Sequence, residues 1–167
     1  MVQVSSAGRA YDLYLCAVTD DGGLWMTIRQ ANGHWAPFID VRQRARSRGH
    51  FTDVDVAIVN GEMHVCGITN DGHLWHAIRR DDTSWAAFED IETNAGDRGS
   101  FVSVATAGGF FGGSSLQVAG VTSDGRLWHT ILQARSGSWS PFEDVEAAAG
   151  EQGSFASVGV GGYTVIP

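Results

Sequence analysis

The sequence predicts an all-β protein built of β-propeller blades, chiefly because one unit with regular turn signals is repeated three times. The chain has 167 residues, among them 22 Gly and three Pro, and no long stretch has helical periodicity. The repeated segments cover residues 13–51, 63–101 and 116–155. The six tryptophans form two series at intervals of 50 to 54 residues, namely Trp25, Trp75, Trp128 and Trp35, Trp85, Trp139.

Each repeat is expected to form four antiparallel strands. An alternating apolar segment runs into an Asp-Gly pair, which is a strong hairpin signal because both residues tolerate positive φ angles. In the middle repeat a second strand follows at residues 74–79 and a third at residues 85–91. A polar crossover then leads to a strand of small residues at 102–107. The turns fall at Asp21-Gly22, Asp71-Gly72 and Asp124-Gly125, and the other third strands at residues 35–41 and 139–145.

Such units fit the blades of a propeller better than a sandwich or a small closed barrel. Small side chains suit a crowded strand beside a central channel, so the strand at 102–107 is placed innermost and the strand at 85–91 outermost. The predicted organisation is a single propeller unit of three blades. The blades are expected at about residues 2–41, 52–91 and 101–145, and the extra inner strand of an unfinished fourth blade at residues 155–167.

Three blades are too few to close a propeller ring, which normally has about four to eight. An open stack would expose two blade faces rich in Trp and Val. We therefore expect a homodimer that closes into a six-bladed ring, with the spare strand at residues 155–167 crossing to the partner chain. Other closures, and a chain that is a fragment of a longer propeller, are the alternatives.

Composition and charge exclude several classes of protein. Eleven Lys and Arg against nineteen Asp and Glu give a net charge of −8, which argues against a nucleic-acid partner. No apolar run reaches the roughly 18 residues of a membrane-spanning helix, so no membrane insertion is expected. The sequence as given has no secretory signal, and the compartment stays open between the cytoplasm and non-classical export. Cys16 and Cys66 hold the same position in successive repeats and are expected to be reduced thiols in the core.

The second strands carry the element Asp-Gly-x-Leu-Trp-His, ending at His76 and His129, and the third strands carry Trp-x-x-Phe. Both elements resemble the repeats of propeller lectins, namely the tachylectin-like and the fungal and bacterial β-propeller lectins. The resemblance implies shallow sugar pockets between adjacent blades, glycans or glycoproteins as partners, multivalent binding and no cofactor. The chain departs from that pattern in having three blades and in having Met26 where the other repeats have histidine.

The repeated aromatic and histidine residues are the candidate carbohydrate-binding residues. An indole face can stack on the apolar face of a sugar ring while its N–H binds a hydroxyl. Pure packing is the competing role, above all for the tryptophans of the third strands. A zinc site is not expected, because His76 and His129 are one to a blade with no paired Cys or His nearby, and zinc needs three or four converging ligands. The candidates are Trp25, Trp75, Trp128, His76, His129, Arg79, Trp35, Trp85 and Trp139.

The repeats also lead us to expect that the protein is not an enzyme. A catalytic site gathers different residue types around one atom, and here the chemically interesting residues are the repeated ones. The adjacent carboxylates Glu89 and Asp90 lie on one strand and point to opposite faces, whereas a glycosidase needs two carboxylates that face each other. Only the aspartate persists in the first repeat, as Asp40, so Asp90 and its counterparts are expected to bond a turn or strand end. We expect a lectin. The alternatives are a structural or protein-interaction module and, third, a glycosidase or lyase built on the propeller.

Overall fold

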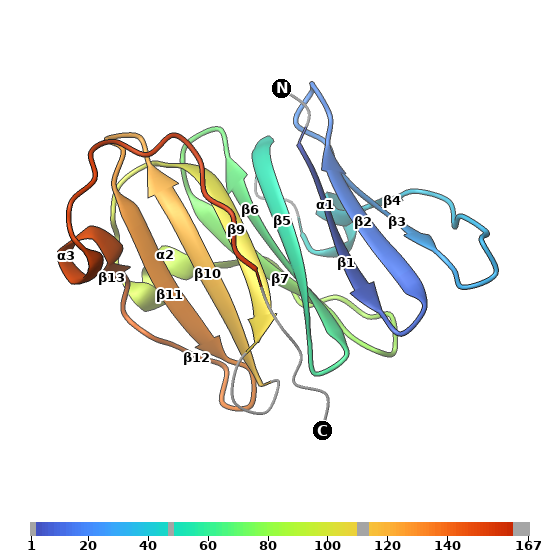
Figure 1. Cartoon of the computed structure of the whole chain (residues 1–167). Helices are drawn as coiled ribbons and strands as arrows, with labels where there is room; N and C mark the ends of the chain where they lie inside the picture. The colour runs from blue at the N-terminus through green and yellow to red at the C-terminus, as the bar shows by residue number, and fades with distance from the viewer. Residues whose placement is uncertain (1–2, 47–48, 110–113, 162–167) are drawn as a thin grey trace.

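The computed structural model describes residues 3–46, 49–109 and 114–161, and these form three antiparallel sheets in chain order (Figure 1). This confirms the prediction of an all-β chain with three antiparallel sheets of four strands each, except that the outer strand of the third sheet is divided into two short strands. The first sheet consists of β1 (Val4–Arg9), β2 (Asp12–Val18), β3 (Leu24–Arg29) and β4 (Ile39–Asp40). The second consists of β5 (Phe51–Val59), β6 (Glu62–Thr69), β7 (Leu74–Arg79) and β8 (Glu89–Asp90). The third consists of β9 (Phe101–Gly109), β10 (Ser115–Thr122), β11 (Leu127–Gln133), β12 (Ser138–Trp139) and β13 (Glu143–Asp144).

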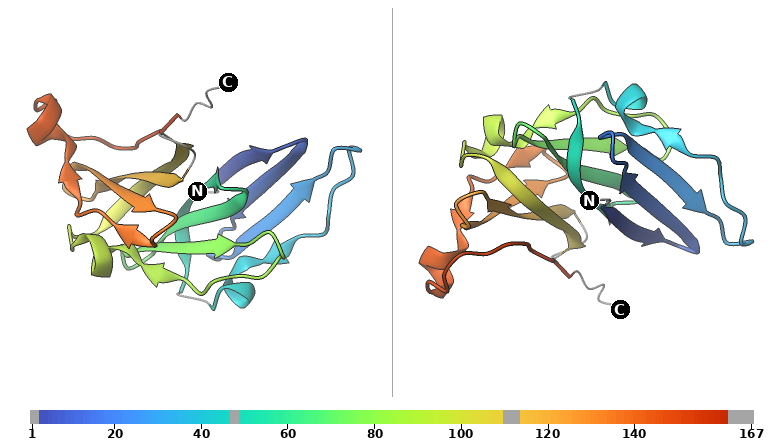
Figure 2. Two further views of the ribbon diagram at one scale, coloured as in Figure 1. Left: turned by 90° about the horizontal axis from the view of Figure 1, so that it is seen from below. Right: turned by 90° about the horizontal axis from the view of Figure 1, so that it is seen from above.

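The sheets fan out from their first strands, so that β5 lies between β1 and β9 (Figures 1 and 2). Buried side chains fill the two spaces between neighbouring sheets. The cluster between the first and second sheets includes Met26, Met63 and Phe88, and the one between the second and third includes Leu74, Leu116 and Phe142. Each sheet therefore packs face to face on the next, as the blades of a propeller do.

The Asp-Gly pairs form the predicted hairpin turns between the second and third strand of each sheet. In the middle sheet Gly72 has a φ of 87°, and the hydroxyl of Thr69 donates to the carboxylate of Asp71 at 2.5 Å. A Cβ at Gly72 would lie 2.6 Å from the Cβ of Ser100, which leads into the next sheet. Glycine is required here both by the φ angle and by this close approach.

The outer strand is interrupted, in contrast to the continuous third strand that we predicted at residues 85–91. Trp85 forms an isolated bridge with Arg79, and regular pairing resumes only at β8. Between them the N–H of Phe88 turns to the preceding sheet and donates to the carbonyl of Ala45 at 2.9 Å. Because that N–H serves the contact between sheets, it does not extend the ladder.

Short helices start the crossovers that follow the outer strands. They are α1 (Val41–Arg44), α2 (Ile91–Ala95) and α3 (Val145–Ala149). The carboxylates of Asp40, Asp90 and Asp144 cap them by accepting two backbone N–H groups each. This confirms the expected role of these aspartates at the strand ends.

The segment after α3 runs back beside β9 (Figure 1). Phe155 N donates to the carbonyl of Gly125 at 2.9 Å, and Val158 N donates to the hydroxyl of Ser103 at 3.4 Å. Residues 155–161 form no strand, and the remainder of the predicted inner strand, 162–167, lies outside the described residues, as does residue 2 of the first blade. No helix among the described residues is long and apolar enough to span a membrane.

Candidate functional site

A cleft of about 240 Å³ opens between the second and third sheets. The second sheet supplies its polar wall, with Glu62 and His64 from β6, His76 from β7 and Glu89 from β8. The third sheet supplies apolar groups, among them Leu132. The cleft is therefore a pocket between blades that combines carboxylates, imidazoles and apolar surface.

Three of these side chains form a hydrogen-bonded series that runs inward from the cleft. Nδ1 of His76 lies 2.8 Å from Oε1 of Glu89, and Nε2 of His76 lies 2.9 Å from Nδ1 of His64. A carboxylate accepts, so His76 donates from Nδ1 and, when neutral, accepts at Nε2 from His64. This arrangement leaves Nε2 of His64 as a buried acceptor without a hydrogen-bond partner among the described residues.

Burial sets the electrostatics of this series. His64 is 1% exposed, and desolvation lowers its pKa to about 3, with neighbouring His76 adding to the effect. The hydrogen bond from His76 lowers the pKa of half-exposed Glu89, so this carboxylate stays ionised at neutral pH. Glu89 is therefore an anionic acceptor at the mouth of the site, supported from within by His76 and by the neutral imidazole of His64.

Trp139 of the third sheet contacts Glu89 and His76 without itself lining the cleft. Its indole N–H donates to Oε1 of Glu89 at 3.2 Å, and its ring meets the His76 ring edge-on at a centroid distance of 5.3 Å. The predicted residues His76 and Trp139 thus come together from neighbouring sheets. A carboxylate beside a half-buried indole can bind hydroxyl groups next to an apolar ligand face.

The corresponding positions of the other sheets differ in chemistry. In the first sheet Tyr14, Met26 and Ile39 stand at the places of His64, His76 and Glu89. This junction is apolar, and the predicted residues Arg79 and Trp85 of the second sheet lie against it, with Arg79 5.8 Å from the Tyr14 ring centroid. In the third sheet His129 remains, and its Nε2 lies 2.9 Å from Oε1 of Gln117.

The tryptophans that precede His76 and His129 lie on the opposite faces of their strands. The indole N–H of Trp75 donates to the Thr69 hydroxyl at 2.9 Å, and that of Trp128 to the Thr122 hydroxyl at 3.3 Å. Trp75 and Trp128 pack on the clusters that face the preceding sheets. Trp25 is half-buried on β3, and Trp35 is 45% exposed on the free face of the first sheet. None of these four lines the cleft with His76.

Our sequence analysis missed His64 and Glu89 as site residues. His64 has no histidine counterpart in the other repeats. Glu89 was not counted as a site residue, because Glu89 and its neighbour Asp90 point to opposite faces of the strand. The hairpin register carried a usable signal, because a turn at Asp71-Gly72 pairs Cys66 with His76 and places His64 on the same face. Glu89 is directly opposite His76 in the next pair.

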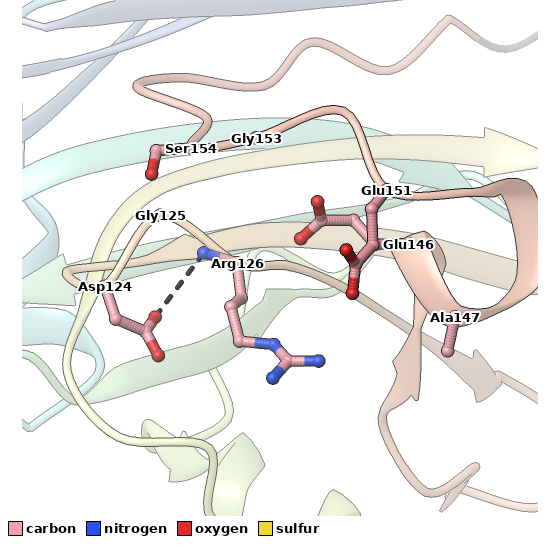
Figure 3. Close-up of a pocket in the computed structure, with 8 residues that line it drawn as sticks. All are labelled: Asp124, Gly125, Arg126, Glu146, Ala147, Glu151, Gly153 and Ser154. Carbon is pink, nitrogen blue, oxygen red and sulfur yellow. Dashed lines mark hydrogen bonds between the residues drawn. The ribbon is translucent and has the colours of Figure 1, made fainter.

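A second depression of about 260 Å³ lies beside the hairpin turn of the third sheet (Figure 3). Arg126, Glu146 and Glu151 line it, and Arg126 forms an ion pair with Asp144. The matching place in the second sheet holds His73, whose Nδ1 lies 3.2 Å from Glu92 and 3.8 Å from Asp90. These three residues could hold a metal ion by their spacing. Arg126 takes the place of His73 in the third sheet, so this set of possible ligands is not repeated there.

Similar folds are found among solved structures. AofleA from Arthrobotrys oligospora is 16% identical, with a TM-score of 0.62 over 97% of this chain and 46% of that chain. The catalytic domain of a Coprinopsis cinerea GH62 α-L-arabinofuranosidase is 12% identical, with a TM-score of 0.55 over 84% of this chain and 49% of that chain. GH43B of a Bacteroides ovatus xyloglucan locus is 12% identical, with a TM-score of 0.55 over 83% and 28%.

These similarities support a propeller fold, and the chain spans about half or less of the length of each similar structure. No protein-family model matches the sequence, and no curated protein matches it. The resemblance to tachylectin-like repeats is therefore not confirmed. Our expectation that the protein is not an enzyme is contradicted, because several similar structures are catalytic domains of glycoside hydrolases. A fold of this kind is therefore compatible with catalysis.

Proposed function

We propose that the protein binds carbohydrate in the cleft between the second and third sheets. The observation that carries this proposal is the group of Glu89, His76 and Trp139, which sets an ionised carboxylate beside an indole at a blade junction. The fold supports it, since the similar structures include the fungal lectin AofleA and carbohydrate-active propellers. Glycans or glycoproteins are the proposed partners.

Each group has a distinct part in binding. Glu89 accepts hydrogen bonds from sugar hydroxyls, and these bonds are strong because the acceptor is charged. Trp139 offers the indole surface for the apolar face of the ring. His76 fixes the Glu89 carboxylate, and His64 fixes His76 in turn. Several weak sites of this kind, brought together by a homodimer that completes a six-bladed ring, would give multivalent binding.

A glycan array probed with the labelled protein tests the proposal. We expect selective binding, and a loss of at least about tenfold in Glu89→Gln and Trp139→Ala, since tenfold equals about 1.4 kcal/mol of binding free energy. Glu151→Gln is the matched control, because it removes an exposed carboxylate outside the cleft and should leave binding unchanged. A folded protein that binds no glycan would refute the proposal and favour a protein-interaction module.

Glycoside hydrolysis is the second candidate, favoured by the catalytic domains among the similar structures and by two carboxylates, Glu62 and Glu89, in one cleft. The protein should then release reducing sugar from the oligosaccharides that it binds. Glu62→Gln and Glu89→Gln should each reduce that rate at least about a hundredfold. Binding without any release of reducing sugar would contradict hydrolysis and leave carbohydrate binding standing.

A further inference from the structure

The outward face of the third sheet, which faces away from the second sheet, repeats part of the site described above. Gln117, His129 and Glu143 occupy the places that His64, His76 and Glu89 hold in the second sheet. His129 contacts Gln117 and pairs with Glu143 across the strands, as His76 pairs with Glu89. In the second sheet the following sheet adds Trp139, but among the described residues no sheet follows the third.

The free face of the first sheet carries the missing aromatic group. Trp35 is the counterpart of Trp139 and is 45% exposed. Phe38 is 61% exposed, whereas its counterparts Phe88 and Phe142 are 2% and 4% exposed. The two phenylalanines are buried because a preceding sheet covers them. Phe38 is exposed because the first sheet has no preceding sheet.

Both junctions within the chain are built from the same contacts. Phe88 N donates to the carbonyl of Ala45, and Phe142 N donates to the carbonyl of Ala95, each at 2.9 Å. At each junction the ring also packs on the first residue of the inner strand of its own sheet, Phe88 on Phe51 at 5.2 Å and Phe142 on Phe101 at 5.4 Å. The end of the third sheet repeats the receiving half of this junction. Ala149 is the last residue of α3 as Ala95 is of α2, and Ala45 comes directly after α1. The N–H of Phe155 donates to the carbonyl of Gly125 as that of Phe101 donates to Gly72.

We propose that a second copy of this chain docks the free face of its first sheet onto the third sheet and completes a composite site there. Phe38 of the second copy would pack between Ala149 and Phe155, and its Trp35 would lie over His129 and Glu143. Two such junctions join six sheets in one ring. The ligand assigned to the composite site rests on the proposed function, whereas the docking itself does not.

Residues 156–161 hold the place that β1 of the second copy would take. They are bound weakly, since Val158 N donates to Ser103 at 3.4 Å and a Cβ at Gly159 or Gly161 would meet no atom within 4 Å. β1, in contrast, is paired with β2 along its whole length. Docking therefore displaces residues 156–161 and leaves β1 in its own sheet.

Mass in solution tests the docking without any sugar. Light scattering should give twice 17.8 kDa for the unchanged chain. Phe38→Asp should give the monomer with an unchanged circular dichroism spectrum, because Phe38 is exposed within one chain. The control Thr83→Asp adds the same charge at an exposed turn of the second sheet and should stay dimeric. A monomer of the unchanged chain at millimolar concentration, or a dimer in Phe38→Asp, would overturn the docking.

Imidazole resonances of His129 test the composite site itself. The ring current of Trp35 should shift them in the dimer, and Trp35→Ala should remove that shift while the mass stays doubled. If His129 is unaffected by Trp35→Ala in the dimer, the sheets meet in another way and the proposal fails. Sugar binding is measured last, with the glycan that gives the strongest array signal. A dimer with the His129 shift but no bound glycan would refute the proposed function and leave the docking established.

Discussion

His64 is the residue that makes the junction between the second and third sheets chemically distinct. Its imidazole is buried, it lies 2.9 Å from His76, and its pKa is lowered to about 3. The corresponding pair in the third sheet uses Gln117, an amide that does not titrate. The equivalent positions of the two sheets thus hold either an imidazole or an amide in contact with the histidine. Glutamine is therefore a conservative replacement for His64.

His64→Gln should make the stability of the protein less sensitive to acid. An unfolded histidine has a pKa of about 6.5, so between there and about 3 the unfolded chain binds a proton that the folded chain does not. Stability therefore falls as the pH drops through this window. Urea denaturation between pH 7 and pH 5 should show a flatter slope in the variant, by up to about 1.4 kcal/mol per pH unit.

The effect of His64 can be distinguished from the effects of Glu89 and His129, whose pKa values are also lowered. The lowered pKa of Glu89 also costs stability in acid, but only as the pH falls below about 4.5. The lowered pKa of His129 also costs stability as the pH falls below the ordinary histidine pKa of about 6.5, but this contribution is present in both proteins. At pH 7 the variant should stay within about 1 kcal/mol of the parent, since the amide replaces one hydrogen bond by another. Equal slopes in the two proteins would contradict the assignment of a buried neutral imidazole.

At the scale of single elements, β9 shows why inner strands are built from small residues. A Cβ at Gly108 would overlap the carbonyl oxygen of Ile58 on β5, whereas one at Gly109 would meet only Gln117, at 3.9 Å. Gly108→Ala should therefore lower the free energy of unfolding by about 1–3 kcal/mol or more, because backbone cannot move aside as a side chain can. Gly109→Ala, the adjacent control, should change it by less than about 1 kcal/mol. Thermal denaturation of both variants provides the measurement.

The elements that the sequence predicts well are those fixed by local chemistry. The Asp-Gly hairpins and the alternating strands beside them follow from turn conformation and side-chain period. The same hairpin occurs in all three sheets. The outer strand could not be predicted in full, because the N–H of Phe88 bonds Ala45 in another sheet. The candidate site, likewise, could be predicted only in part. His76 and Trp139 are repeated residues, whereas His64 matters through a diagonal contact that only the register shows.

At the scale of the whole molecule, Asp55 on β5 joins all three sheets. One carboxylate oxygen accepts the hydroxyl of Ser5 on β1, and the other accepts the backbone N–H and, at 3.1 Å, the hydroxyl of Thr106 on β9. The neighbouring Asp53 adds a bond from Val104 N at 2.9 Å. The inner strands are thus connected through side chains of the middle strand as well as by packing, which favours unfolding of the three sheets as one unit.

Asp55→Ala should lower the free energy of unfolding by about 2–4 kcal/mol, because it leaves the N–H of Thr106 without its acceptor in a buried position and removes two further bonds. Asp55→Asn keeps one acceptor oxygen and should lose about half as much. Hydrogen exchange followed by mass spectrometry distinguishes a local effect from a global one. If Asp55 couples the sheets, exchange should accelerate in β1 and β9 together in the alanine variant. Acceleration confined to β5 would mean that the two junctions are held independently, each by its own apolar cluster.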